Sequence, residues 1–150
     1  MKKYELTEET NTLADGTVLH RIRALRDIPM HGVKYGDLGG FVERENNLSH
    51  DGDAWVCGNA YVYGDARVYG DAEVCGYADY MVIKNIWSSG RWFTYTRSNK
   101  KWKVGCFYGT GEELIKKAYA DSKVSGKCYE AIVRAVETIE AAKAEAKARK

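Results

Sequence analysis

Small and branched apolar residues recur every six positions between Ala54 and Tyr80. The alanine column holds Ala54, Ala60, Ala66, Ala72 and Ala78, and the second column holds Val56, Val62, Val68, Val74 and then Tyr80. Because residues two apart in an extended strand point to the same side, each Ala-x-Val triplet predicts a short strand that buries both residues. The Gly-Asp and Gly-Asn pairs between triplets tolerate positive φ and predict a sharp turn after each strand.

Two architectures suit such short strands. An antiparallel meander needs strands of about four residues with a two-residue loop every time. A parallel β-helix instead bends the chain by about a third of a turn at each Gly-Asp and stacks coil on coil. We favour the parallel β-helix.

The phrase V-x-G-[DN]-A-x, as in "VYGDAR" from Val62 to Arg67, resembles the hexapeptide repeat of left-handed parallel β-helices. The resemblance implies the left hand and a coil of three hexapeptides, which is 18 residues. Residues 18 apart would then stack at about 4.8 Å, as in the pairs Val56 and Val74, Ala54 and Ala72, and Cys57 and Cys75. We expect both of these thiols to be free, because a reducing cytosol disfavours a disulfide.

The flanks carry other patterns. "KKYELT" and "TVLHRIRAL" predict one hairpin, and "RWFTYT" and "KWKVGCF" around the turn "RSNKK" predict another. "TGEEL" predicts a helix start capped by Thr110 and Glu113, and Ser125-Gly126 predicts a break before a second helix. We therefore predict a mainly β chain with a C-terminal α segment, one compact unit made of an N-terminal β cap (1–35), the β-helix (36–83), a β-hairpin (84–108) and a helical segment (109–150).

Composition narrows the function only a little. Charged residues make up 29% of the 150 residues and balance to a formal +2, which does not by itself indicate a nucleic-acid binder. No stretch approaches 18 apolar residues, and "MKKYELTEET" lacks the apolar region of a signal peptide, so we expect a cytoplasmic protein that does not enter the membrane. The four cysteines are too far apart for a CxxC motif, and we expect neither a metal site nor a cofactor.

Motifs for catalysis are weak. The chain lacks the glycine-rich phosphate loops and the hydrolase motifs, and the aspartates of the repeat have a structural role in its turns. Hexapeptide-repeat acyltransferases, which the repeat resembles, use a histidine base, and the candidates here are His20, His31 and His50. Since His50 adjoins Asp51, it can act as a general base, and an acyltransferase-like enzyme stays the alternative to our expectation of a non-enzyme.

Two surfaces are candidates for binding. The first is the outward side of the repeat, where aromatic residues and a cation suit an interaction hot spot or base stacking, with the residues Trp55, Tyr61, Tyr63, Arg67 and Tyr69. The second is the segment "RWFTYTRSNKKWK", where basic and aromatic residues interleave in a way that suits phosphate contact, with the cations Arg91, Arg97, Lys100, Lys101 and Lys103. The structural alternative is that these rings pack on the neighbouring segments and the cations are merely solvated.

The flanks and the repeat together resemble a group of small proteins common in phages and prophages of Gram-positive bacteria. The matching stretches are "KYELTEET", "HRIRAL", "GDLGGFVERENNLSHDGDAWV", the VYGDA repeats and "GCFYGTGEEL". The resemblance implies a phage accessory protein that acts by binding in the host cytoplasm. We expect a counter-defence inhibitor that, as anti-CRISPR proteins do, occludes a host defence protein or nucleoprotein such as a CRISPR nuclease, or that sequesters a nucleotide signal.

Assembly is a related expectation. Exposed rings on the flat faces of a short β-helix would be buried in a symmetric homo-oligomer, either a trimer or a dimer. A structural module whose coils stack on one another is a third interpretation of the same repeat.

Overall fold

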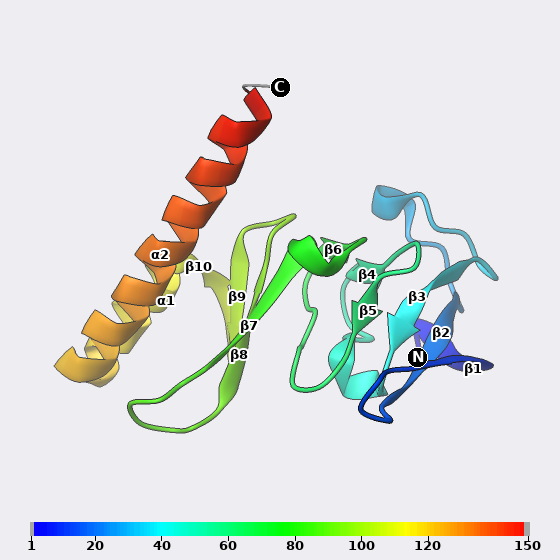
Figure 1. Cartoon of the computed structure of the whole chain (residues 1–150), viewed down its shortest axis with the longest axis horizontal. Helices are drawn as coiled ribbons and strands as arrows, with labels where there is room; N and C mark the ends of the chain where they lie inside the picture. Colours follow the sequence, from blue (N-terminus) through cyan, green and yellow to red (C-terminus); the bar gives the residue numbers. More distant parts are fainter. Residues whose placement is uncertain (1, 149–150) are drawn as a thin grey trace.

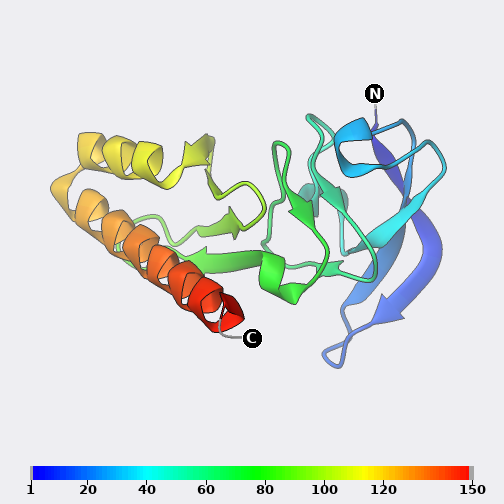
Figure 2. The same ribbon diagram turned by 90° about the horizontal axis from the view of Figure 1, so that it is seen from above.

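The computed structural model describes residues 2–148, and its parts follow one another along the long axis of the molecule (Figure 1). The N-terminal strands form one end, the repeat lies in the middle, and a second sheet with both helices forms the other end. Figure 2 shows the same order from above, with α1 and α2 at the end away from the N-terminus.

The elements are mostly short. The strands of the described residues are β1 (Tyr4–Thr12), β2 (Val18–Ala24), β3 (Leu38–Val42), β4 (Trp55–Val56), β5 (Tyr61–Val62), β6 (Glu73–Val74), β7 (Tyr80–Lys84), β8 (Trp92–Thr96), β9 (Lys101–Val104) and β10 (Phe107–Thr110). The helices are α1 (Gly111–Asp121) and α2 (Lys123–Ala148), with 3-10 turns η1 (Pro29–His31), η2 (Glu45–Asn47) and η3 (Tyr77–Asp79).

Within residues 2–148 the strands form three sheets of two to four strands. One is mixed, in the order β1-β2-β3-β5, with only β3 and β5 parallel to each other. The second is antiparallel, in the order β10-β9-β8-β7, and the third is the parallel pair β4-β6. Since none of these sheets is closed or wound into a solenoid, the prediction of a left-handed parallel β-helix is wrong.

The shortness of the repeat strands explains the difference. β4, β5 and β6 have two residues each, so each makes few ladder hydrogen bonds and depends on its neighbours. β5 pairs with β3 and so joins the sheet of the N-terminal hairpin. After the repeat, β7 pairs with β8 in antiparallel fashion over five residues, which ends any stacking of parallel coils.

The local geometry of the repeat is nevertheless as predicted. Val56 pairs with Val74 in the β4-β6 ladder, 18 residues apart. The alanines and valines of both columns from Ala54 to Val74 are buried, and they belong to one core cluster. The inward positions of both columns are therefore confirmed over this stretch, although the architecture built from them is different.

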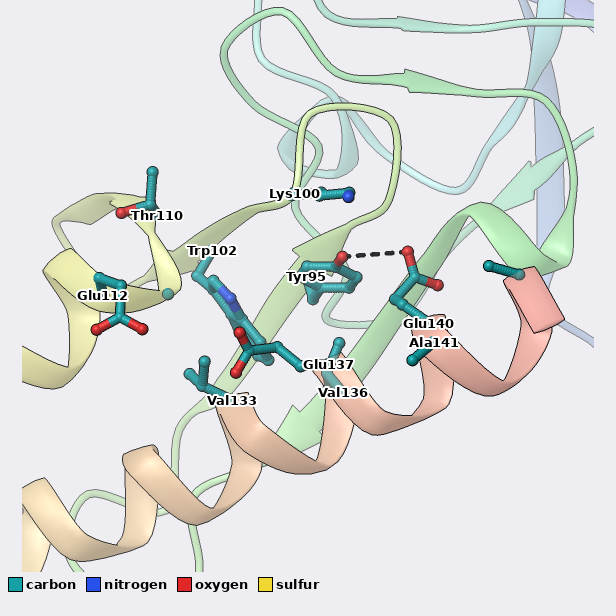
Figure 3. Close-up of a pocket in the computed structure, with 12 residues that line it drawn as sticks. Tyr95, Lys100, Trp102, Thr110, Glu112, Val133, Val136, Glu137, Glu140 and Ala141 are labelled. Atoms are coloured by element: carbon teal, nitrogen blue, oxygen red, sulfur yellow. Dashed lines mark hydrogen bonds between the residues drawn. The ribbon is translucent and has the colours of Figure 1, made fainter.

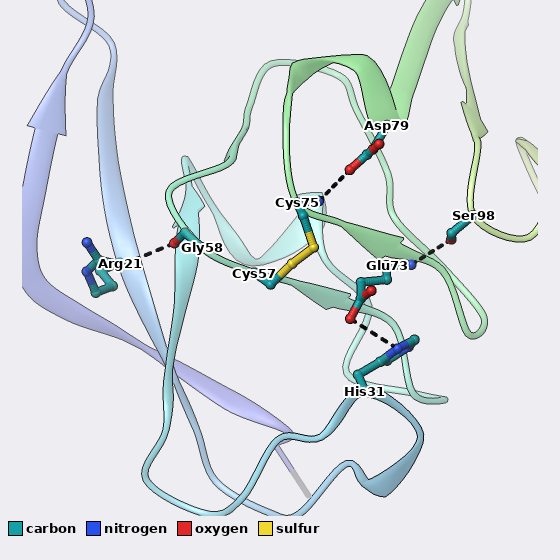
Figure 4. Close-up of a disulfide and its surroundings, with 8 residues drawn as sticks. All are labelled: Arg21, His31, Cys57, Gly58, Glu73, Cys75, Asp79 and Ser98. Carbon is teal, nitrogen blue, oxygen red and sulfur yellow. Dashed lines mark hydrogen bonds and ion pairs between the residues drawn. A yellow bond between two sulfur atoms is a disulfide. The ribbon is translucent and has the colours of Figure 1, made fainter. Parts of the chain in front are cut away.

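The expectation of free thiols in the repeat is wrong. A disulfide joins Cys57 to Cys75, with 4.7 Å between the Cα atoms (Figure 4). Each cysteine directly follows one of the paired valines, so the ladder register places the two side chains next to each other on the same side. In the described part of the chain, Cys106 and Cys128 have free thiols.

The flanks mostly follow the sequence pattern. β1 and β2 form the first predicted hairpin, and β8 and β9 form the second. Thr110 caps α1, with its hydroxyl accepting from the Glu113 backbone N–H and the Glu113 carboxylate accepting from the Thr110 N–H. Neither helix of the described residues has the length and apolarity needed to cross a membrane.

The break predicted at Ser125-Gly126 is wrong. α1 ends at Asp121 and α2 runs without a break from Lys123 to Ala148. Gly126 lies inside α2 against the ring of Tyr119, where a Cβ atom would overlap the ring. The glycine therefore serves the close approach of the two helices rather than a turn.

Candidate functional site

Side chains from the repeat and from the second sheet line a common cleft of about 470 Å³. The repeat contributes Arg67, and the sheet contributes Arg91, Trp92 and Lys103. The remaining lining residues are Asp65 and Gly105. The cleft thus joins one residue of the predicted outward face of the repeat to two cations of the predicted basic hairpin.

One of the hydrogen bonds between the repeat and the second sheet positions Arg67. The backbone N–H of Arg67 donates to the Thr94 hydroxyl in β8, at 3.0 Å. Thr94 pairs with Lys103 in the β8-β9 ladder, and Trp92 lies two residues before Thr94 on the same face of β8. The bond therefore brings Arg67 beside the face that carries Trp92 and Lys103.

The charges in the cleft are available to a ligand. Among the described residues, Arg67, Arg91 and Lys103 make no ion pair, and Asp65 is the one acid that lines the cleft. Three cations against one carboxylate leave a net positive site. Converging charges of one sign in a concave site attract an anionic ligand.

Aromatic rings hold the lysines of the hairpin in place. The ammonium group of Lys103 lies over the ring of Tyr69, 4.4 Å from its centroid, and that of Lys101 lies over Tyr108, at 5.5 Å. The Tyr108 hydroxyl donates to the Tyr69 carbonyl at 3.1 Å, and burial raises the pKa of Tyr108, which keeps it a neutral donor. Trp92 is 45% exposed, so its ring can stack with a ligand.

The structure thus brings together five residues of the two predicted surfaces: Arg67, Tyr69, Arg91, Lys101 and Lys103. Trp92 was not among the site residues predicted from the sequence. Its signal was the alternation in β8, where Phe93 and Tyr95 are core residues and Trp92 falls on the opposite side.

Other predicted residues of the repeat lie elsewhere. Trp55 is only 2% exposed and belongs to the same buried cluster as Ile28 and Val33, so it is a core residue. Tyr61 is half-buried, and its hydroxyl accepts from the Asn11 amide at 3.0 Å. Tyr63 is exposed but does not line the cleft.

Two cations of the hairpin also lie apart from the cleft. Arg97 donates to the Glu140 carboxylate in α2 at 2.7 Å, which ties the β8-β9 hairpin to the helix. Lys100 is exposed in the tight turn between β8 and β9, where its φ is 54°. Arg97 thus has a structural role, and Lys100 lines a different cavity, between the second sheet and α2.

A second cleft, of about 450 Å³, lies between the second sheet and α2 (Figure 3). Its carboxylates already have protein partners, because Glu112 and Glu137 both accept from Arg134, at 2.6 and 2.7 Å. Burial raises the pKa of Tyr95 to about 12, and its hydroxyl donates to Glu140 at 3.4 Å. We interpret this cleft as the seam along which α2 packs on the sheet.

The histidine proposed as a base for the alternative enzyme is fully engaged. The Nδ1 atom of His50 accepts from the backbone N–H of Lys3 at 3.1 Å, and its Nε2 donates to the Glu45 carboxylate at 3.0 Å. The ring of Tyr4 stacks on the imidazole, with 4.2 Å between centroids. These contacts leave His50 without a lone pair for a substrate proton.

No known family model matches the chain, and no curated protein is similar to it in sequence.

Proposed function

We propose that this is a non-catalytic binding protein that holds a nucleotide in the cleft between the repeat and the second sheet. Arg67, Arg91 and Lys103 bind the phosphate, and the ring of Trp92 stacks on the base. The observation that supports this most is the convergence of three cations without ion-pair partners among the described residues, around an exposed tryptophan.

The dimensions and energies suit this ligand. A volume of about 470 Å³ lies within the roughly 300–1,000 Å³ of typical small-ligand sites. Stacking of a base on an aromatic side chain contributes about 1–3 kcal/mol. Each phosphate contact with a single strand adds about 0.7 to the log-log salt slope of binding.

The resemblance to small phage proteins gives this proposal its biological context. In the cytoplasm of an infected host, such a protein would act in counter-defence, either by sequestering a nucleotide signal or by covering a nucleic-acid strand on which a defence nuclease depends. Both uses need the same chemistry, a phosphate and a base, and binding experiments distinguish between them.

The experiment is a titration with two probes, a fluorescent single-stranded oligonucleotide and a labelled cyclic dinucleotide, at several salt concentrations. The test variant replaces Arg67, Arg91 and Lys103 by alanine together. A matched control replaces Lys34, Lys100 and Lys127, which are exposed, lie outside the cleft and change the net charge equally.

We expect binding to fall in the cleft variant and to persist in the control variant. A steep salt slope with the oligonucleotide indicates a strand ligand, whereas tighter binding of the dinucleotide indicates a signal. Equal losses in the two variants, or no binding of either probe at low salt, contradict the proposal.

A further inference from the structure

A second group of side chains lies around the disulfide of the repeat (Figure 4). The ligand atoms of Cys57, Cys75 and Glu73, two sulfurs and a carboxylate oxygen, all lie within 4.8 Å of one another. The Nδ1 atom of His31 lies 3.3 Å from the Glu73 carboxylate, but His31 is outside the group whose ligand atoms all lie within 4.8 Å of one another. Sulfur, carboxylate and imidazole are the three ligand types that zinc uses in proteins.

The β4-β6 ladder explains why these residues meet. Cys57 donates its backbone N–H to the Val74 carbonyl at 2.8 Å, which sets it beside Cys75. Glu73 and Cys75 are two residues apart, so their side chains leave the strand on the same side. The backbone is held at both positions, because the Glu73 N–H donates to the Ser98 hydroxyl and the Cys75 N–H to the Asp79 carboxylate, each at 2.8 Å.

His31 reaches this group from the segment that covers the repeat. It ends the short turn η1, which Ile28 and Val33 close by pairing across it, and its side chain is buried. The Nε2 atom lies 3.0 Å from the Asp71 carbonyl, to which it can only donate. That bond leaves Nδ1 facing Glu73. Many metal-binding histidines are oriented in this way, because the ring nitrogen that does not bind the metal donates to a carbonyl or carboxylate oxygen.

Two oxygens therefore face the two nitrogens of His31, the Asp71 carbonyl and the Glu73 carboxylate. A neutral ring carries one proton and donates to only one of them, whereas an imidazolium ring donates to both. A metal ion between Nδ1 and the carboxylate would satisfy the second contact in place of a proton.

We propose that the reduced form of the protein binds a thiophilic divalent cation, with Zn²⁺ as the best fit, through Cys57, Cys75 and Glu73, and that the imidazole of His31 moves in as the fourth ligand. Two sulfurs, one oxygen and one nitrogen make up the four-coordinate set that zinc prefers. Two thiolates on one zinc ion lie about 3.8 Å apart, given Zn–S bonds of about 2.3 Å in a tetrahedral site. Neighbouring positions on paired strands provide such a spacing.

The disulfide makes this site dependent on redox state. A dithiol reductant supplies two electrons and two protons, the S–S bond between Cys57 and Cys75 breaks, and the reductant becomes a disulfide. Binding of Zn²⁺ to the two thiols then releases two protons and forms two Zn–S bonds. The oxidised protein has no thiolates to offer and does not bind the ion.

The site is open to both a reductant and a metal ion. Glu73 and Cys75 line a cavity of about 420 Å³, and Cys75 is exposed. Arg97 and Lys100 line the same cavity, as do the carboxylates of Asp79 and Glu140.

The test is a titration of the reduced and the oxidised protein with Co²⁺, followed by displacement with Zn²⁺. The remaining thiols are removed beforehand by Cys106→Ser and Cys128→Ser, so that any thiolate signal comes from Cys57 and Cys75. We expect one Co²⁺ per reduced chain, with the visible absorption of a tetrahedral thiolate site, and two protons released per Zn²⁺ ion. The oxidised chain should give no such spectrum.

Glu73→Gln and His31→Gln keep both cysteines and should each weaken Co²⁺ binding by at least the roughly 10- to 100-fold that loss of an outer-shell partner costs. Cys57→Ser with Cys75→Ser should abolish the thiolate absorption, with circular dichroism to verify the fold. Absence of the band in the reduced parent overturns the proposal. Unchanged affinity in both the Glu73 and the His31 variants overturns the four-ligand assignment, even if the cysteine variant does not fold.

Discussion

The ammonium group of Lys103 lies over the ring of Tyr69, with 4.4 Å between Nζ and the ring centroid. Tyr69 belongs to the repeat and Lys103 to β9, so this contact joins the two parts of the molecule that form the basic cleft. A lysine side chain is flexible, and a ring beneath it lowers the entropy lost when the ammonium group binds a phosphate.

Replacing Tyr69 by leucine should therefore lower both the stability of the protein and the affinity of the cleft for its ligand. The cation–π contact contributes about 0.5–1 kcal/mol at an exposed site, and we expect a loss of that size in the free energy of unfolding, measured in urea. Tyr69→Phe keeps the ring and serves as the control. If phenylalanine and leucine lower the stability equally, the contact with Lys103 is not the cause.

Substitutions of two tryptophans should have opposite effects, one on ligand binding and the other on the stability of the fold. Trp92 is 45% exposed in the cleft, so Trp92→Ala should cost about 1–3 kcal/mol in nucleotide binding and little in folding. Trp55 is 2% exposed, so Trp55→Ala should cost about 3–5 kcal/mol in folding. Urea unfolding and ligand titration of both variants test this, and full binding by Trp92→Ala would count against the stacking role.

The contrast between these tryptophans shows what the sequence could and could not predict. Alternation along a strand is local, so it correctly placed the alanines and valines of the repeat inside. It also placed the side chain of Trp55 on the outward face of its strand, opposite to Ala54 and Val56. It could not show that residues 28–33 cover this face and bury the ring. Exposure depends on a distant segment, and no local pattern records it.

Strand partners were equally hard to predict. β4 pairs with β6 at the expected offset of 18 residues, whereas β5 pairs with β3 at an offset of 20, as in Phe41 with Tyr61. Two-residue strands carry too little pattern to choose between such offsets. The basic hairpin was visible in the sequence, but its meeting with Arg67 depends on the bond to Thr94, which joins residues 27 positions apart.

Two glycines of the repeat should differ when each is replaced by alanine. Gly58 and Gly70 both have positive φ, 61° and 67°, so both substitutions cost about 1–2 kcal/mol in backbone strain. A Cβ atom at Gly58 meets open space, whereas one at Gly70 overlaps the Tyr108 hydroxyl. We expect Gly70→Ala to cost about 1–3 kcal/mol more than Gly58→Ala in thermal or urea unfolding.

That difference isolates the contact with Tyr108. The Tyr108 hydroxyl donates to the Tyr69 carbonyl and accepts from the Asn99 amide at 2.7 Å, and a shift of its ring breaks both bonds. Equal stabilities of the two alanine variants would mean that the ring moves away at no cost.

The buried Lys3 predicts an unusual dependence of stability on pH. Its ammonium group has no exposed surface and donates to the Ala54 carbonyl at 2.5 Å. Desolvation by burial, assisted by the nearby charge of Arg26, lowers the pKa of Lys3 from 10.5 to about 8. Between these two values the unfolded chain binds a proton that the folded chain does not, so stability should rise with pH from about 8 to about 10.

Lys3→Met should remove this rise, because the variant has no amine at that position to titrate. Above pH 10 the sign reverses: burial raises the pKa of both Tyr80 and Tyr95 to about 12, so the folded chain keeps protons that the unfolded chain has lost. The urea midpoint of the parent should therefore pass through a maximum near pH 10. Other groups titrate in both proteins, so the difference between parent and variant reports Lys3 alone, and parallel curves from pH 8 to 10 would show that its pKa is not lowered.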